Sequence, residues 1–231
     1  ALVKTLVEKD TLFMHGKKII VSGPQEDRVI RAFNNVRFYK SDMSGKCDSL
    51  HSNNKTQLTK MIGKPILWNN ENQMTGDIMH LIGNNETQKL DSLKVLNNAF
   101  IIQKDSLSKN GYNQIKGQNL YGKFVDSKLK EVDVVKNAEV IYYMYNDANE
   151  FIGINKTVCS KINLELEENK IDAITFFTKT DSHIYPEADF PENARKLRGF
   201  LWRGDERILS KDDIFPAEEI ALDDKIQIEA K

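Results

Sequence analysis

The sequence predicts an all-β protein made of antiparallel strands that bend in the middle and repeat along the chain. Apolar residues recur at every second position, which is the spacing of a strand with one buried face. Segments with a shared layout recur about four times. No long segment keeps its apolar side chains at the helical spacing of about 3.6 residues, so helices are expected to be minor.

The composition is that of a folded protein with almost no net charge. Of the 231 residues, 40% are hydrophobic and 29% are charged, and the net charge is -1. Such a chain has no overall positive field to attract nucleic acid over long distances. The sequence contains no apolar run long enough for a transmembrane helix and does not begin with the pattern of a signal peptide. Composition alone therefore leaves the cellular compartment open.

The first recurring segment is a strand interrupted by a polar bend. It occurs at residues 30–39, 59–68, 93–102 and 132–141. Each copy has a mostly apolar pair spaced by two, a polar bend, and a second pair spaced by two. The bend is Asn-Asn in two of the copies, and Asn tolerates left-handed backbone and caps its own backbone groups. The four segments are therefore predicted to be strands that change direction at the bend.

The second recurring segment contains a glycine and alternates with the first. Gly45, Gly76 and Gly117 mark three copies, and a degenerate copy covers residues 154–159. Glycine inside a strand pattern indicates a bend or a close approach of backbone. Each pair of segments is predicted to form a hairpin of two bent strands. Residues 11–21 are expected to form the first strand, with an unpaired edge, and residues 171–178 the last.

Strands that all bend predict two sheets that meet along a fold line, with an apolar cleft between them. One alternative is that the same side chains simply fill a closed sandwich core. The apolar residues that point to the shared side are Val36, Phe38, Leu67, Leu93, Val95, Ile101, Val132, Val134, Val140, Tyr142, Ile174 and Phe176.

The chain changes character at Pro186. Prolines interrupt it, apolar residues become sparse and charges crowd together. We therefore predict a β-repeat domain over residues 1–185 and a C-terminal extension rich in proline and charge over residues 186–231. A short helix is expected at residues 192–197, and the extension is expected to cover the edge of the last strand.

The repeats resemble the OstA-like family, relatives of the lipopolysaccharide-transport protein LptA. The resemblance covers roughly residues 11–185 and rests on an N-x-V-x-F strand at residues 34–38 and an S-G-x-x-D-S-L strand at residues 44–50. Residues 197–207 and 210–215 are also similar to the ending of Bacteroidetes members. The resemblance implies a V-shaped β-taco or β-jellyroll, a location in the periplasm of a Gram-negative bacterium, and lipid acyl chains in the cleft. The twelve cleft residues would then line a lipid groove.

Residues with the potential for catalysis or metal binding do not form a recognisable pattern. The four histidines are scattered, and no Gly-x-Ser-x-Gly, His-Glu-x-x-His or phosphate-binding glycine loop occurs. Cys47 and Cys159 occupy similar places in distant repeats, about six strand steps apart, so both are expected to be free thiols. We predict no enzyme, no metal site and no cofactor.

The arginines lie in two clusters of the sequence, and the first consists of Arg28, Arg31 and Arg37. Arginine matches phosphate with two hydrogen bonds, so these three are candidate contacts for lipid head groups. The alternative is a solvated face whose charges pair with nearby acids.

Two functions of different classes are consistent with the sequence. The first is a non-enzymatic carrier that binds lipopolysaccharide or another acyl lipid and transfers it toward the outer membrane. The second is a structural β-repeat scaffold that binds other envelope proteins through its sheet edges. Expected protein partners are transport components of the same family, or a second copy in head-to-tail contact through the edge strands. Nucleic acid is not expected.

Overall fold

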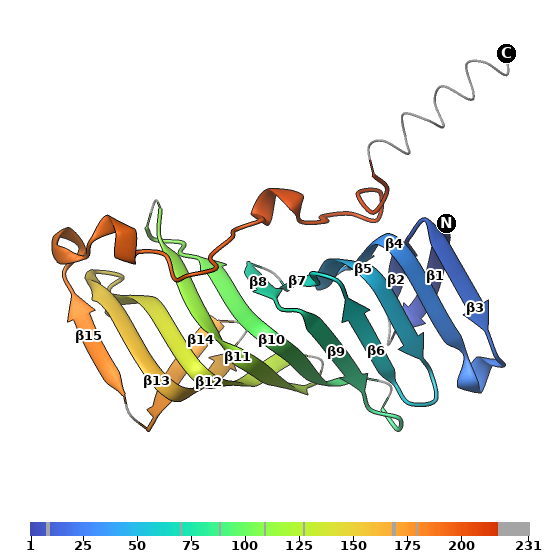
Figure 1. The fold of residues 1–231 in the computed structure, drawn as a ribbon, viewed down its shortest axis with the longest axis horizontal. Coiled ribbons are helices and arrows are strands. Elements are labelled where there is room, and N and C mark those ends of the chain that lie inside the picture. Colours follow the sequence, from blue (N-terminus) through green and yellow to red (C-terminus); the bar gives the residue numbers. More distant parts are fainter. Residues whose placement is uncertain are drawn as a thin grey trace, which may run out of the picture.

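The all-β prediction is confirmed by a computed structural model, which describes residues 1–7, 10–69, 71–87, 89–108, 110–126, 128–167, 170–178 and 180–216. Fifteen strands in this part of the chain join into one antiparallel sheet, which is folded over on itself (Figure 1). The helices found there are 3-10 turns at Gln25–Asp27, Glu187–Asp189, Glu192–Ala194 and Gly204–Glu206, none able to span a membrane. The strands are β1 (Leu2–Val7), β2 (Asp10–His15), β3 (Lys18–Ser22), β4 (Val29–Lys40), β5 (Met43–Asn53), β6 (Leu58–Ile62), β7 (Ile66–Asn69), β8 (Asn72–Thr75), β9 (Ile78–Gly83), β10 (Leu90–Lys104), β11 (Tyr112–Val125), β12 (Lys128–Tyr145), β13 (Phe151–Glu167), β14 (Lys170–Phe177) and β15 (Asp181–Tyr185).

The chain runs back and forth through two walls. The long strands β4, β5, β10, β11, β12 and β13 pass through both walls. One wall is completed by β1, β2, β7, β8 and β15, and we call it the strap wall because the C-terminal segment lies on it. The opposite wall is completed by β3, β6, β9 and β14.

Left-handed backbone makes the bends between the walls. Asn34 and Asn35 have φ of 63° and 58°, and Asn97 and Asn98 have φ of 57° and 52°. Lys136 and Asn137 adopt the same conformation, with φ of 64° and 53°. The strand pairing shifts register at these points. The predicted bends are therefore confirmed.

The bend in the second repeat divides its strand in two. Gly63 and Lys64 have φ of 82° and 53°, and Pro65 follows them between β6 and β7. Proline has no backbone N–H to donate to the ladder, so the strand stops here and restarts in the strap wall.

Gly76, between β8 and β9, and Gly117, in β11, lie where the inner faces of the two walls approach each other. A Cβ at Gly76 would lie 2.3 Å from Cγ1 of Val95, and a Cβ at Gly117 would lie 2.6 Å from Cγ1 of Val134. Both distances are far below van der Waals contact. Glycine at these positions therefore lets the valines close the interior at the bend.

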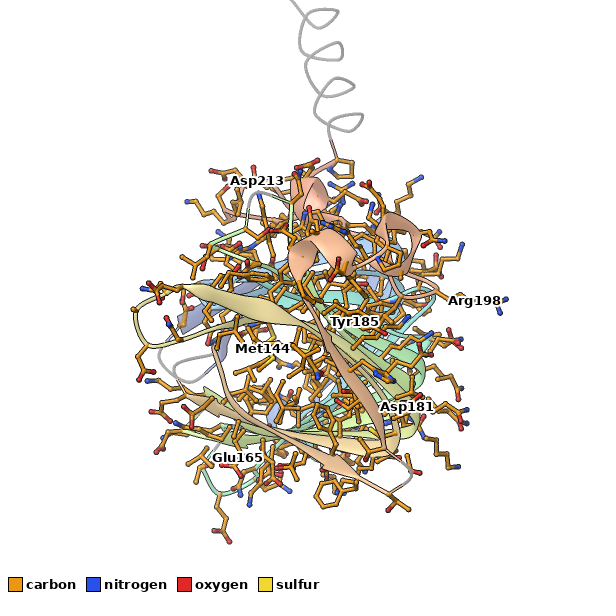
Figure 2. All side chains as sticks on the ribbon, turned by 90° about the vertical axis from the view of Figure 1, so that its left-hand side faces the viewer. Met144, Glu165, Asp181, Tyr185, Arg198 and Asp213 are labelled. Atoms are coloured by element: carbon orange, nitrogen blue, oxygen red, sulfur yellow. The ribbon has the colours of Figure 1, made fainter. Side chains whose placement is uncertain are left out.

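The C-terminal segment, residues 186–216, forms a strap along the outer face of the strap wall (Figure 1). Phe190 and Leu197 of the strap are buried against outward-facing Phe100, Ile102 and Ile141, which makes a second hydrophobic core. The strap wall is therefore apolar on both faces. In Figure 2, Arg198 of the strap points away from the body. The rest of the predicted extension, residues 217–231, lies outside the described residues.

Two buried glutamines attach the strap to the wall. Gln114 Nε2 donates to the carbonyl of Arg195 at 2.7 Å, and the N–H of Leu197 donates to Gln114 Oε1 at 2.8 Å. Gln73 makes the same pair of bonds with Leu201 and Arg203, both at 2.7 Å. Each amide thus binds residues i and i+2 of an extended segment, as a neighbouring strand would.

Ion pairs and an aromatic contact hold the end of the strap. Glu206 accepts hydrogen bonds from Arg203 at 2.7 Å and from Lys46 at 3.2 Å, and this lowers the pKa of Glu206 to about 2. The ring of Phe215 lies 5.0 Å from that of His15 on β2. The strap therefore follows the outer face as far as β2.

Three expectations for the ends of the sheet need correction. Residues 11–21 do not form one edge strand. They form β2, which β1 covers along its whole length, and β3, which pairs only with β4. The strap does not cover the edge of the last strand, because its apolar side chains pack on the outer apolar face of the strap wall instead. The helix expected at residues 192–197 is reduced to the 3-10 turn Glu192–Ala194.

The bend conformation predicts a clear difference between two substitutions of Asn137. Asn137→Gly should leave stability nearly unchanged, because glycine adopts left-handed backbone without strain. Asn137→Val should lower the free energy of unfolding by about 1–2 kcal/mol. Urea denaturation of both variants checks this, and equal midpoints would show that the bend does not depend on the left-handed residue.

The glutamine attachment predicts that Gln114→Leu loosens the strap. The substitution leaves the carbonyl of Arg195 and the N–H of Leu197 without partners, at a cost of about 1–3 kcal/mol for each buried group. Trypsin should then cleave the strap next to Arg195 and Arg198 at least tenfold faster than in wild type. Gln118→Leu, on the exposed side of the same strand, is the control. Equal cleavage rates in the two variants would contradict the attachment.

Candidate functional site: a cavity between the walls

The predicted groove residues lie together in the main hydrophobic core between the walls. Nine of the twelve are buried, and Tyr142, Ile174 and Phe176 are partly buried against the same cluster. Side chains fill the space between the walls when the molecule is viewed from the β15 end (Figure 2). The prediction of a shared face therefore agrees with the structure, and along most of the molecule that face is a packed core.

A cavity of about 280 Å³ opens between the walls at the N-terminal half of the molecule. Its apolar lining comes from both walls. Of the predicted groove residues, only Phe38 contributes to it. The apolar side chains that line it are Leu12, Met14, Ile30, Phe38, Met43, Leu50, Leu81 and Leu90.

The rim of the cavity is polar and carries two lysines. Lys40 pairs with Asp42 at 2.8 Å at the turn between β4 and β5. Lys89, next to the start of β10, pairs with Asp126 at 2.7 Å. Asn53 and Gln57 complete the rim on the opposite wall. The arrangement combines an apolar interior with cations and hydrogen-bonding groups at the mouth, which is the chemistry that an amphipathic ligand requires.

Small polar side chains leave room for the cavity on the opposite wall. Ser52 and Thr59 face it from β5 and β6, and their hydroxyl oxygens lie 2.8 Å apart. Gly83 lines it from β9. The equivalent inner positions farther along the sheet hold larger side chains such as Leu93 and Val132, and there the walls pack together.

The alternation of apolar residues could have identified most of the lining. Ile30 precedes the buried Ala32 by two positions and faces the same side, and Leu81 stands in the same relation to Met79. What the alternation could not show is which inner residues border empty space, because this depends on the size of side chains on other strands.

The structure does not bring Arg28, Arg31 and Arg37 together. Arg31 faces outward from the opposite wall, opposite His51. Arg37 faces outward from the strap wall, opposite Lys46. Arg28 is exposed just before β4. Their role as head-group contacts stays a prediction.

Candidate nucleophiles and metal ligands are not assembled in the part of the chain that the structure covers. No three His, Cys, Asp or Glu side chains are close enough there to hold a metal ion. Cys47 and Cys159 are both buried free thiols. Burial raises the pKa of Cys47 to about 12, which removes the thiolate that a nucleophile needs at neutral pH.

Comparison with known proteins gives a distant structural similarity. No family model matches the chain, and no curated protein matches it. Among solved structures, the chain is similar to LptH from Pseudomonas aeruginosa, described as the LptA-homologous periplasmic component of the lipopolysaccharide transport device. The TM-score is 0.47 and the identity is 16%, over 63% of this chain and 99% of that one. Similarity at this level leaves the function to be inferred from the residues of this chain.

The buried thiols give a prediction that can be checked without a ligand. The denatured, unreduced protein should show two reactive thiols, because Cys47 and Cys159 are free. In the native protein, Cys47 should react with iodoacetamide far more slowly than it does in the denatured protein, because its raised pKa and its burial suppress the thiolate. A denatured sample without reactive thiols would contradict the strand register that separates the two cysteines.

Proposed function

We propose that this protein is a non-enzymatic carrier that binds acyl chains of lipopolysaccharide, or of a related acyl lipid, in the cavity and passes them toward the outer membrane. The observation that supports the proposal is the apolar cavity between the walls, with Lys40 and Lys89 at its rim. Anionic head groups would remain at the rim while the acyl chain enters the interior. The sequence resemblance to OstA-like proteins favours the periplasm as its location.

The size of the cavity is consistent with part of an acyl chain. Its volume of about 280 Å³ lies near the lower end of the range of ligand pockets, about 300–1,000 Å³. Burying about ten methylene groups would gain roughly 8 kcal/mol before the costs of binding. This suffices for capture, and the loss of a few contacts would permit release. A longer chain would reach Leu67, Val95 and Ile101 only if the walls moved apart.

The ends of the sheet support the second candidate, a scaffold that binds envelope proteins. Among the described residues, β3 pairs only with β4, and β14 pairs only with β13. Such strands present unpaired backbone groups to which a partner strand can add. A scaffold of this kind would need no lipid, so a lipid-binding measurement separates the two candidates.

The carrier proposal predicts that filling the cavity weakens lipid binding. Leu81→Trp places a larger side chain in the cavity and removes room for about two methylenes, which should weaken binding about tenfold or more. The measurement is displacement of a fluorescent fatty acid by purified lipopolysaccharide, with bound lipid identified by native mass spectrometry.

Ile82→Trp is the matched control, because Ile82 follows Leu81 on β9 but faces the outer side of the wall. Thermal melting of both variants shows whether the fold is intact. If the folded Leu81→Trp protein binds lipopolysaccharide as wild type does, the cavity is not the binding site. If wild type binds no acyl lipid, the scaffold is the better explanation.

A further inference from the structure

A straight row of five basic side chains crosses the outer face of the opposite wall. In this row Arg31 pairs with His51, His51 with Lys60, Lys60 with His80, and His80 with Lys94. The five residues lie on the adjacent strands β4, β5, β6, β9 and β10 (Figure 1). Strands are about 4.8 Å apart, so the row is roughly 19 Å long. All five face away from the cavity, because their neighbours in sequence point inward.

The rows on both sides of the basic row contain no carboxylate. Toward the bend, the facing residues are Phe33, Ser49, Ile62, Ile78 and Leu96. Toward the open ends of the strands, they are Val29, Asn53, Leu58, Ile82 and Ser92. Most of these side chains are apolar, and all ten are partly exposed. The surface is therefore a basic stripe between two largely apolar stripes.

Several basic side chains on other parts of the sheet have acidic partners. Lys161 pairs with Asp133 at 2.8 Å on the same face, and Lys116 pairs with Glu139 at 2.9 Å. None of the five residues of the row forms an ion pair with a carboxylate within the described ranges. Like charges directly opposite each other on adjacent strands destabilise a sheet. The row therefore carries an electrostatic cost that an external anion would remove.

We propose that this face docks the protein on an anionic bilayer surface, with the row of Arg31, His51, Lys60, His80 and Lys94 lying along the lipid phosphates. The chain as a whole has no net positive charge, so the attraction is local and depends on this row. The proposal does not depend on lipid in the cavity, because the row faces the other side of the wall.

A bilayer fits this surface better than a soluble polyanion or an acidic protein. A soluble polyanion would neutralise the charges and leave the flanking Phe33, Ile62 and Ile78 in water. The interface of a bilayer takes up basic and apolar groups together. A second copy of the chain is a weaker candidate for the partner. The acidic side chain that its same face would offer to the row, Asp133, is already paired with Lys161 of that copy.

Protonation of His80 adds to the positive charge of the row. Burial, followed by the charges of Lys60 and Lys94, lowers the pKa of His80. These two lysines are the charged groups that face it from the adjacent strands β6 and β10. Docking should therefore strengthen as the pH falls through the lowered pKa of His80, which lies below the ordinary histidine value of about 6.5. An anionic surface would in turn raise the pKa of His80, which NMR titration can follow.

The test is co-sedimentation of the full chain with vesicles. One set contains phosphatidylcholine alone, and the other contains equal amounts of phosphatidylcholine and phosphatidylglycerol. Wild type should bind only the anionic vesicles, less at high salt. Lys60→Gln combined with Lys94→Gln should weaken this binding about 10-fold to 30-fold, since each cation near such a surface contributes about fivefold. His80→Gln should reduce the gain at low pH.

The matched control is Lys104→Gln combined with Lys211→Gln, which removes two exposed charges from the strap wall and the strap, away from the docking face. It should bind as wild type does, and so should the cavity variant Leu81→Trp. Equal binding by the two double variants, equal binding to both kinds of vesicle, or no binding of wild type at low salt would overturn the proposal. It would also be overturned if ultracentrifugation showed that the row only joins two copies of the chain.

Discussion

Every other feature of this structure depends on a pair of left-handed residues in the middle of a strand. In β4, β10 and β12 this pair turns the strand from one wall into the other. The glycine strands β5, β11 and β13 contain no left-handed residue, and they follow the bend of the strands with which they pair. The left-handed conformation costs an ordinary residue about 1–2 kcal/mol, and Asn or Gly reduces that cost at most of the bends. Because the bends recur on every second strand of the sheet, they align into a single fold line along the molecule.

In the strands with a left-handed pair, the inward-facing positions keep an even spacing across the bend. Val95 precedes the bend of β10 and Ala99 follows it at an even spacing, and both face the interior. On the glycine strands the phase changes instead, since the inward residues Ile115 and Leu120 of β11 lie at an odd spacing. The register shifts in the pairing accommodate this difference. This is why the two segments of each repeat have different sequence layouts.

The sequence was sufficient to predict the strands, the bends and the common face of the twelve inner residues, because these are set by local periodicity. The strap could have been anticipated in part, since β10 continues after its bend as an unbroken apolar run, Phe100-Ile101-Ile102, which is typical of a strand buried on both faces. Its course along the wall depends on Gln73 and Gln114, which are far from it in sequence. The cavity and the basic row depend on which residues of separate strands stand side by side. That follows from the register, which periodicity alone does not give.

The strap wall is stabilised by more packing contacts and hydrogen bonds than the opposite wall. The strap wall lies between two hydrophobic cores and is bonded to the strap through two buried glutamines. Among the described residues, the opposite wall packs against the inner core alone. Local opening occurs first where the fewest apolar contacts are buried, so a widening of the cavity is expected to move the opposite wall about the fold line. The basic row lies on that same wall, and a surface bound there acts on the part of the molecule that has the most freedom to move.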